Sequence, residues 1–201
     1  MRKPSGHLRI VGGQFKGQKL NSLEGQALRP TADRVRESLF NILDHLSIKQ
    51  RDGSPLVDAR VLDRFAGTGA LGIEALSRGA KDVWFIDRSL ASQRLIKQNY
   101  QSITGQPHLA SGIRIGDEGL VGLGQASLRR PFDVIFCDPP YGFMDWEALV
   151  DGFESSNLVA SSTLLVVELD GKDAFPDLSK RWALLKDRRF GRTRVQIFLR
   201  H

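Results

Sequence analysis

From Arg60 onward the chain alternates short apolar runs with amphipathic stretches, and this alternation constrains the fold more than any other feature. The apolar runs are Val61–Phe65, Val83–Ile86, Ile113–Ile115, Phe132–Cys137 and Thr163–Leu169. The helical patterns between them are Ala70–Ser77, Leu90–Tyr100, Glu118–Leu128 and Trp146–Phe153. Because strands that are connected through helices pair in parallel, the pattern predicts an α/β fold with helices on both faces of one sheet.

The last part of the chain has a different pattern. Two apolar runs, Trp182–Leu185 and Val195–Leu199, have no helical pattern between them, and Gly191 lies in their connection. A glycine between two strands favours a tight turn. We therefore expect a hairpin that closes the otherwise parallel sheet with a terminal antiparallel strand.

The first part of the chain is interpreted as a small extension, 1–50, packed on a larger domain, 51–201. The polar stretch 50–55 marks the boundary. In the extension, Leu8–Val11 and Phe15–Leu20 flank a Gly-Gly-Gln turn and predict a short hairpin.

A helix is expected after this hairpin, with Thr31 as its N-cap. Its apolar stripe consists of Val35, Leu39, Ile42 or Leu43, and Leu46. Arg34, Glu37 and Asn41 fall on the other side of this helix, where they either face a ligand or form a solvated surface with an Arg34–Glu37 pair.

The positive charge is concentrated at the two ends of the chain. The formal net charge is +6 for the whole chain, with +6 in residues 1–36, +7 in residues 180–201 and −7 in the rest. Basic N- and C-terminal segments around an acidic central part favour a surface that binds a polyanion such as a nucleic acid.

Cysteine usage and hydropathy indicate the compartment. Cys137 is the only cysteine and lies in an apolar run, so we expect a buried structural thiol, no intrachain disulfide and a reducing cytoplasm. The sequence contains no apolar run of 18 residues and no secretory signal pattern, so no membrane association is expected.

A glycine-rich segment follows the first predicted strand. Gly67, Gly69 and Gly72 stand at the bend before a helical pattern, where an open backbone and free helical N–H groups suit a nucleotide-like ligand. The expected cofactor contacts of the loop are Phe65, Ala66, Gly67, Thr68 and Gly69. Asp87 ends the second strand and is placed to accept ribose hydroxyls of an adenosine moiety.

Asp63 bears on the identity of this ligand. A carboxylate just before the turn repels the pyrophosphate of a nicotinamide dinucleotide and attracts the ammonium and sulfonium of S-adenosylmethionine. The loop therefore favours S-adenosylmethionine over NAD. Asp117, after the third strand, is either a contact to the adenine amine or a helix cap.

The segment Asp138-Pro139-Pro140-Tyr141 follows the fourth strand and is the most specific signal in the chain. An exocyclic amine of a base is a poor nucleophile because its lone pair is delocalised into the ring. The Asp138 carboxylate, which also borders the cofactor, and the Pro139 carbonyl can hold both amine hydrogens. Tyr141 offers a stacking face, worth roughly 1–3 kcal/mol. These three residues are predicted to be catalytic, in a reaction that needs no metal.

Four segments carry a family resemblance: Leu8–Gly13, Leu28–Asn41, Leu62–Leu76 and Asp138–Tyr141. With them the chain resembles the bacterial small-subunit (16S) ribosomal RNA guanine-N2 methyltransferase D family (RsmD). The run R-P-T-x-D-R-V-R-E is the most specific part of the match. Arg64 departs from the small or apolar residue that is usual in the family, and Asp87 stands where the family often has Glu.

The resemblance implies a Rossmann-like class I methyltransferase fold with seven strands and S-adenosylmethionine as donor. It implies the N2 amine of a guanine in small-subunit ribosomal RNA as acceptor, within an assembling ribosomal particle. We expect a cytoplasmic monomer. The expected RNA contacts are Lys16, Lys19, Arg29, Arg34 and Arg36.

Other acceptors remain open at this point. Adenine N6 in DNA or RNA and the glutamine amide of a protein also offer a planar NH2 group to an Asp-Pro-Pro-Tyr segment. A different class of function is a non-catalytic RNA-binding factor for ribosome assembly, against which the intact glycine loop and Asp138 argue.

Overall fold

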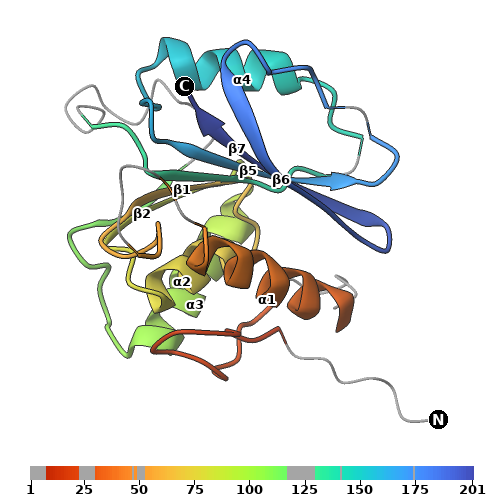
Figure 1. The fold of residues 1–201 in the computed structure, drawn as a ribbon. Helices are drawn as coiled ribbons and strands as arrows, with labels where there is room; N and C mark the ends of the chain where they lie inside the picture. Colours follow the sequence, from red (N-terminus) through yellow and green to blue (C-terminus); the bar gives the residue numbers. More distant parts are fainter. Residues whose placement is uncertain are drawn as a thin grey trace.

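A computed structural model describes residues 8–22, 30–46, 48, 53–116, 130–140, 142–173 and 175–201. Helices and strands within these ranges alternate along most of the chain (Figure 1). They are α1 (Pro30–Asp44), β1 (Arg60–Arg64), α2 (Ala70–Ser77), β2 (Asp82–Ile86), α3 (Leu90–Thr104), β3 (Ile113–Gly116), β4 (Val134–Cys137), α4 (Trp146–Ser155), β5 (Leu164–Asp170), β6 (Trp182–Phe190) and β7 (Thr193–Arg200).

The strands form one seven-stranded sheet in the order β3-β2-β1-β4-β5-β7-β6. β1 to β5 pair in parallel, and β7 pairs antiparallel with both β5 and β6. The predicted mostly parallel α/β fold with a last antiparallel strand is confirmed. The hairpin turns at Gly191, whose φ of 61° favours glycine. Because this hairpin folds back toward the sheet centre, β7 lies between β5 and β6 and β6 forms the edge.

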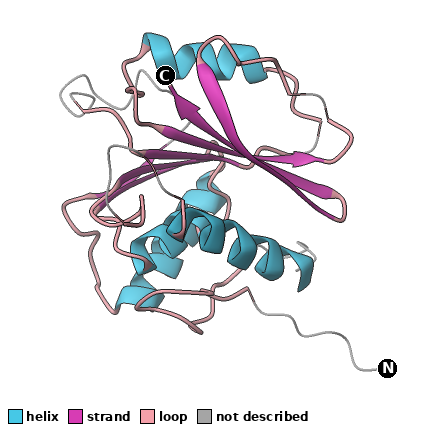
Figure 2. Ribbon diagram, viewed as in Figure 1, coloured by secondary structure: helices cyan, strands magenta, loops and turns pink. Residues whose placement is uncertain are grey.

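Helices cover both faces of the sheet (Figure 2): α1, α2 and α3 pack on one face and α4 packs on the other. Each face has its own apolar core. Ile10, Leu39, Phe40 and Phe136 belong to the first, whereas the second includes Trp146 and the α4 face of the central strands. β1 and β4 are buried along their whole length, as expected of parallel strands covered on two sides.

The N-terminal segment forms a short version of the predicted hairpin. Arg9 and Lys19 form an antiparallel bridge, the Ile10 N–H donates to the Gln18 carbonyl at 2.9 Å and the Leu20 N–H donates to the Leu8 carbonyl at 2.7 Å. The turn binds α2: Gln14 N–H donates to the Ser77 carbonyl at 2.8 Å and Phe15 N–H to Ser77 Oγ at 2.9 Å. Contacts to α2 thus add to a hairpin that has only one bridge.

Helix α1 begins at Pro30, so Thr31 lies within the helix and is not its N-cap. Proline suits this first helical position because its missing N–H has no partner there. The expected helix at 118–128 lies outside the described residues, as do residues 49–52 at the predicted boundary. The division at residue 50 stays a prediction. Among the described residues, no helix has the length and apolarity needed to cross a membrane.

Candidate active site

The carboxyl ends of four parallel strands bring the candidate residues to one edge of the sheet. Arg64 pairs with Ile86 of β2 and with Cys137 of β4, and Cys137 pairs with Val167 of β5. The residues that follow these positions therefore meet at the same edge. This is where open α/β sheets bind ligands.

The loop after β1 has an unusual backbone. Gly67 and Gly69 have φ values of 55° and 77°, and Phe65, at 67°, shares this left-handed region. A bulky side chain rarely adopts it, and such strain is often found at functional sites. The N–H groups of Phe65 and Ala66 both donate to the Ile86 carbonyl, at 3.0 and 3.1 Å, which holds the bend.

Asp63 and Gly72 connect β1 to α2. The buried Asp63 carboxylate accepts the Gly72 N–H at 2.9 Å. A Cβ at Gly72 would lie 2.3 Å from Cε1 of Phe85, so only glycine allows this close approach. Desolvation raises the pKa of Asp63 well above its usual value, and the nearby charges of Asp138 and Asp87 raise this pKa further.

Asp87 holds the glycine loop. One carboxylate oxygen accepts the Gly67 N–H and the other accepts the Ser89 N–H, both at 2.8 Å. Each oxygen retains a further lone pair, and the side chain is half-buried. Asp87 is thus fixed in orientation at the edge where the predicted ribose would lie.

Asp138 directly follows β4. No described residue forms a hydrogen bond or ion pair with its carboxylate. Water reaches the side chain, yet the surrounding protein desolvates the carboxylate and raises its pKa to about 6. Cys137, one residue earlier, is buried, and its pKa is raised by desolvation, which fits a structural thiol. Tyr141 and Asp117 lie outside the described residues, so their predicted roles stay predictions.

Glu168 on β5 lies at the same edge and was not among the residues predicted from the sequence. Val167 pairs with Cys137, so the next residues, Glu168 and Asp138, lie side by side. Desolvation raises the pKa of Glu168 to about 8; the charge of Asp138 raises it further, and that of Arg36 lowers it. In the sequence, the only indication of a role for Glu168 is that it is a single acidic residue within the apolar run Thr163–Leu169.

The predicted RNA contacts divide into two groups. Lys16, Lys19 and Arg34 are exposed, whereas Arg36 is buried. The Arg36 guanidinium donates to Asp33 at 2.9 Å and to the Arg9 carbonyl. Its burial argues against a phosphate contact and for a structural role. Arg29 lies outside the described residues.

Buried polar side chains of α2 and α3 hold the N-terminal segment in place. Glu74 is fully buried and accepts the Val11 N–H at 2.8 Å. Asn99 is also fully buried; it accepts the Asn21 N–H at 2.8 Å and donates to the Thr68 carbonyl at 2.9 Å. Asn99 therefore joins the segment to the glycine loop.

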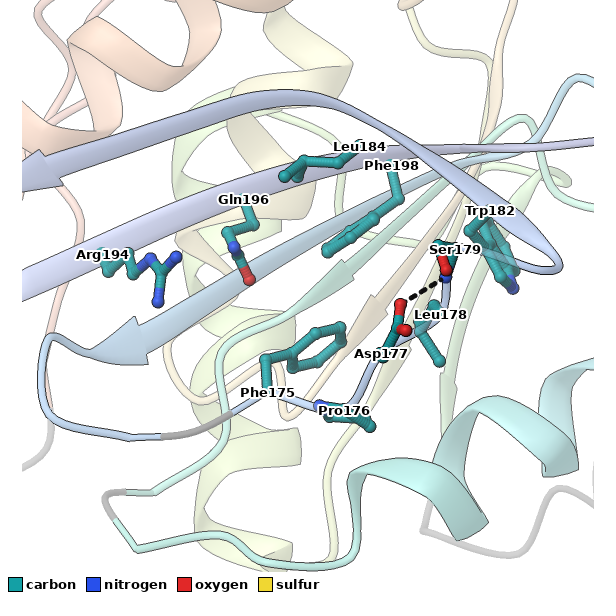
Figure 3. Close-up of a pocket in the computed structure, with 10 residues that line it drawn as sticks. All are labelled: Phe175, Pro176, Asp177, Leu178, Ser179, Trp182, Leu184, Arg194, Gln196 and Phe198. Atoms are coloured by element: carbon teal, nitrogen blue, oxygen red, sulfur yellow. Dashed lines mark hydrogen bonds between the residues drawn. The ribbon is translucent and has the colours of Figure 1, made fainter.

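A cavity of about 250 Å³ lies on the α4 face of the sheet (Figure 3). It is lined by Phe175, Pro176, Asp177, Leu178, Ser179, Trp182, Leu184, Arg194, Gln196 and Phe198. None of the predicted site residues lines this cavity. Glu168 shares its sheet face with Val166 of the opposite core, so the cavity and the acidic edge are separate features.

Comparison with known proteins identifies the family. A family model described as Conserved hypothetical protein 95 matches residues 8–199. The chain belongs to this family. Ribosomal RNA small subunit methyltransferase D of Escherichia coli (strain K12) is 34% identical over 205 residues, covering 100% of this chain and 96% of the relative. The protein of the same name from Haemophilus influenzae is 36% identical over 189 residues, covering 92% and 90%. The predicted family and the enzyme class, a methyltransferase, are confirmed.

Solved structures share the fold. The structure of yhhF, a proposed methyltransferase from Escherichia coli, has a TM-score of 0.74 and 31% identity, covering 98% of this chain and 99% of that chain. SMU.776, a proposed methyltransferase solved with S-adenosylhomocysteine, has a TM-score of 0.60 and 15% identity, covering 86% and 50%.

The described residues fit S-adenosylmethionine, the cofactor predicted for this enzyme class. Asp63 interacts with the charges of both Asp87 and Asp138, so the edge carries negative charge that suits an ammonium and a sulfonium. The loop is also open among the described residues, because the only one of their atoms that a Cβ at Gly67 would meet is the Phe65 carbonyl oxygen, at 3.9 Å.

Asp87→Ala is expected to weaken S-adenosylmethionine binding about tenfold or more, because it removes acceptors for the ribose and frees the Gly67 N–H. Calorimetric titration measures the affinity. Asp87→Glu, which restores the carboxylate, should bind within a few-fold of the unmodified protein. Unchanged affinity in Asp87→Ala contradicts the assigned role.

Proposed function

We propose that the protein transfers a methyl group from S-adenosylmethionine to the exocyclic N2 amine of a guanine in small-subunit ribosomal RNA. The relatives named for ribosomal RNA methylation support the class of substrate. The observation that carries the proposal is the Asp138 carboxylate, which stands at the cofactor edge with no hydrogen-bond partner among the described residues. Such an acceptor is suited to an amine.

The protein's own groups make the amine reactive. The cofactor, when bound, supplies a methyl group on a sulfonium, which is a good leaving centre. Asp138 and the Pro139 carbonyl accept the two amine hydrogens and direct the nitrogen lone pair toward the methyl group. The amine proton passes to Asp138 or to water as the N–C bond forms. Tyr141 stacks on the flipped base.

The exposed lysines of the N-terminal segment belong to the proposed RNA surface. Lys16 and Lys19 are exposed, and Lys19 lies on the bridge to Arg9 that shapes the segment. Because Asn99 joins this segment to the glycine loop, RNA that is bound there lies on the same rigid unit as the cofactor loop. We place the enzyme in the cytoplasm as a monomer that acts on an assembling ribosomal particle.

The double variant Lys16→Glu, Lys19→Glu is expected to lower RNA affinity at low salt and to reduce the slope of log K against log salt by about two. Filter binding at several salt concentrations measures both effects. A variant with the same change in charge at two exposed lysines outside both basic segments, Lys81→Glu with Lys97→Glu, serves as the control. Equal slopes for the two variants place the RNA surface elsewhere.

The proposed reaction is tested by transfer of tritiated methyl from S-adenosylmethionine to small ribosomal subunits from cells that lack the protein. Naked ribosomal RNA, DNA and a protein with a glutamine acceptor are assayed in parallel. Nucleoside analysis of the labelled product should give N2-methylguanosine. A label on adenine or on the glutamine amide replaces the proposed acceptor, and no label on any substrate supports a non-catalytic factor.

A further inference from the structure

Four acids at the carboxyl edge differ in their partners. Asp63 accepts the Gly72 N–H, and Asp87 accepts the N–H groups of Gly67 and Ser89. Asp138 and Glu168 receive no hydrogen bond from any described residue. Backbone N–H groups thus bind Asp63 and Asp87, the two acids nearest the glycine loop. The other two carboxyl groups lie next to each other.

The sheet register places these two carboxyls together. Cys137 and Val167 pair in parallel, so Asp138 and Glu168 follow on strands about 4.8 Å apart. Val167 and Leu169 are buried, whereas Glu168 is half-buried. Glu168 lies on the same face as Val166, toward α1, and pairs across with Val195 of β7.

Buried Arg36 supplies the cation near Glu168. Arg36 interacts with the charge of Glu168 and is oriented by Asp33 and by the Arg9 carbonyl. Its Nε lies 3.9 Å from the Glu74 carboxylate and has no hydrogen-bond partner among the described residues. A half-buried acid beside a second carboxylate is costly without such a cation. Arg36 therefore offsets part of the cost of a charge on Glu168, but no described residue forms a hydrogen bond or ion pair with the Glu168 carboxylate.

We propose that Glu168 is a substrate-binding residue that accepts the N1–H of guanine, next to the N2 amine held by Asp138. This inference rests on the proposed function. Guanine presents N1–H and N2–H donors side by side on its Watson–Crick edge, and two adjacent carboxyls complement them. A base with a lone pair at N1, such as 2-aminopurine, faces repulsion from an ionised Glu168 even though it carries the same amine.

The protonation of Glu168 gives this role a pH signature. The charged groups that act on Glu168 are Asp138, which raises its pKa, and Arg36, which lowers it. Because the pKa of Glu168 is raised to about 8, the side chain ionises and becomes an N1–H acceptor as the pH rises through that value. Selection for guanine should therefore increase from about pH 7 to about pH 8.5, below the pH at which guanine N1–H itself ionises.

The test compares Glu168→Gln with the unmodified protein on RNA that carries either guanine or 2-aminopurine at the methylated position. The unmodified protein should prefer guanine about tenfold or more in kcat/KM. The glutamine amide of the variant offers both a donor and an acceptor, so the preference should fall to near equality and its rise with pH should disappear.

Two further variants complete the design. Glu168→Asp keeps a carboxylate and should retain a preference for guanine, and Glu147→Gln, at an exposed position of α4, should match the unmodified protein. Calorimetry with S-adenosylmethionine confirms that each variant is folded. If Glu168→Gln keeps the full guanine preference and its pH dependence, Glu168 does not read N1. If the unmodified protein methylates neither RNA, the proposed function itself fails.

Discussion

Asp138→Ala is expected to lower the rate of methyl transfer by about 10²- to 10³-fold, because it removes the acceptor that orients the reacting amine. The loss should appear mainly in kcat, since the interaction is strongest when the amine nitrogen becomes pyramidal. Asp138 has no hydrogen-bond partner among the described residues, so the substitution leaves no buried donor of those residues unsatisfied. Single-turnover transfer of labelled methyl to the RNA substrate measures the rate.

The affinity for S-adenosylmethionine and the pH dependence of activity distinguish the catalytic role of Asp138 from a structural one. S-adenosylmethionine should bind Asp138→Ala within a few-fold of the unmodified protein, and Asp145→Ala, an exposed position before α4, should retain full activity. Because desolvation raises the pKa of Asp138 to about 6, the carboxyl is protonated below that pH and can no longer accept the amine hydrogen. Activity of the unmodified protein should therefore fall as the pH drops through 6. A fully active Asp138→Ala variant contradicts the mechanism.

Glu74→Ala is expected to lower the free energy of unfolding by about 3–5 kcal/mol, because it removes one side of a buried ionic network. Glu74 is fully buried; it accepts the Nε–H of Arg78 at 2.9 Å and the Val11 N–H at 2.8 Å. Arg36 lies 3.9 Å away. Without the carboxylate, the Val11 N–H loses its acceptor, and buried Arg36 and half-buried Arg78 lose a shared counterion.

Denaturant unfolding and the melting temperature measure this loss. For a chain of this length, 3–5 kcal/mol corresponds to a fall in Tm of about 6–20 °C. Glu74→Gln keeps an acceptor oxygen and should fall between the unmodified protein and Glu74→Ala. Glu147→Ala, on the exposed side of α4, should change stability by less than about 0.5 kcal/mol. A loss below about 1 kcal/mol in Glu74→Ala means that the network does not hold the N-terminal segment.

Local chemistry explains why much of the site could be predicted. Gly72 must lack a side chain because α2 approaches Phe85 of β2, and the third glycine of the motif meets that requirement. Asp63 lies near the end of β1 and Asp87 directly follows β2, and both bind backbone N–H groups in or close to the loop. These residues lie in short segments whose backbone conformation depends on the segment itself.

The residues that were missed or misplaced depend on contacts between distant segments. Arg36 was expected to contact RNA, yet it is buried and donates to the Arg9 carbonyl of the N-terminal segment. Glu168 interrupts an apolar run, and only its pairing with β4 shows that it adjoins Asp138. No periodicity within one segment contains that information.

Hydropathy and backbone preferences over a few neighbouring residues were enough to predict the alternation of strands and helices, the glycine loop and the Asp-Pro-Pro-Tyr segment. The position of β7 inside the sheet, the burial of Arg36 and the proximity of Glu168 to Asp138 depend on the folded chain. Strand register and helix packing bring together charges from separate segments, and their desolvation and mutual repulsion arise only once the chain has folded.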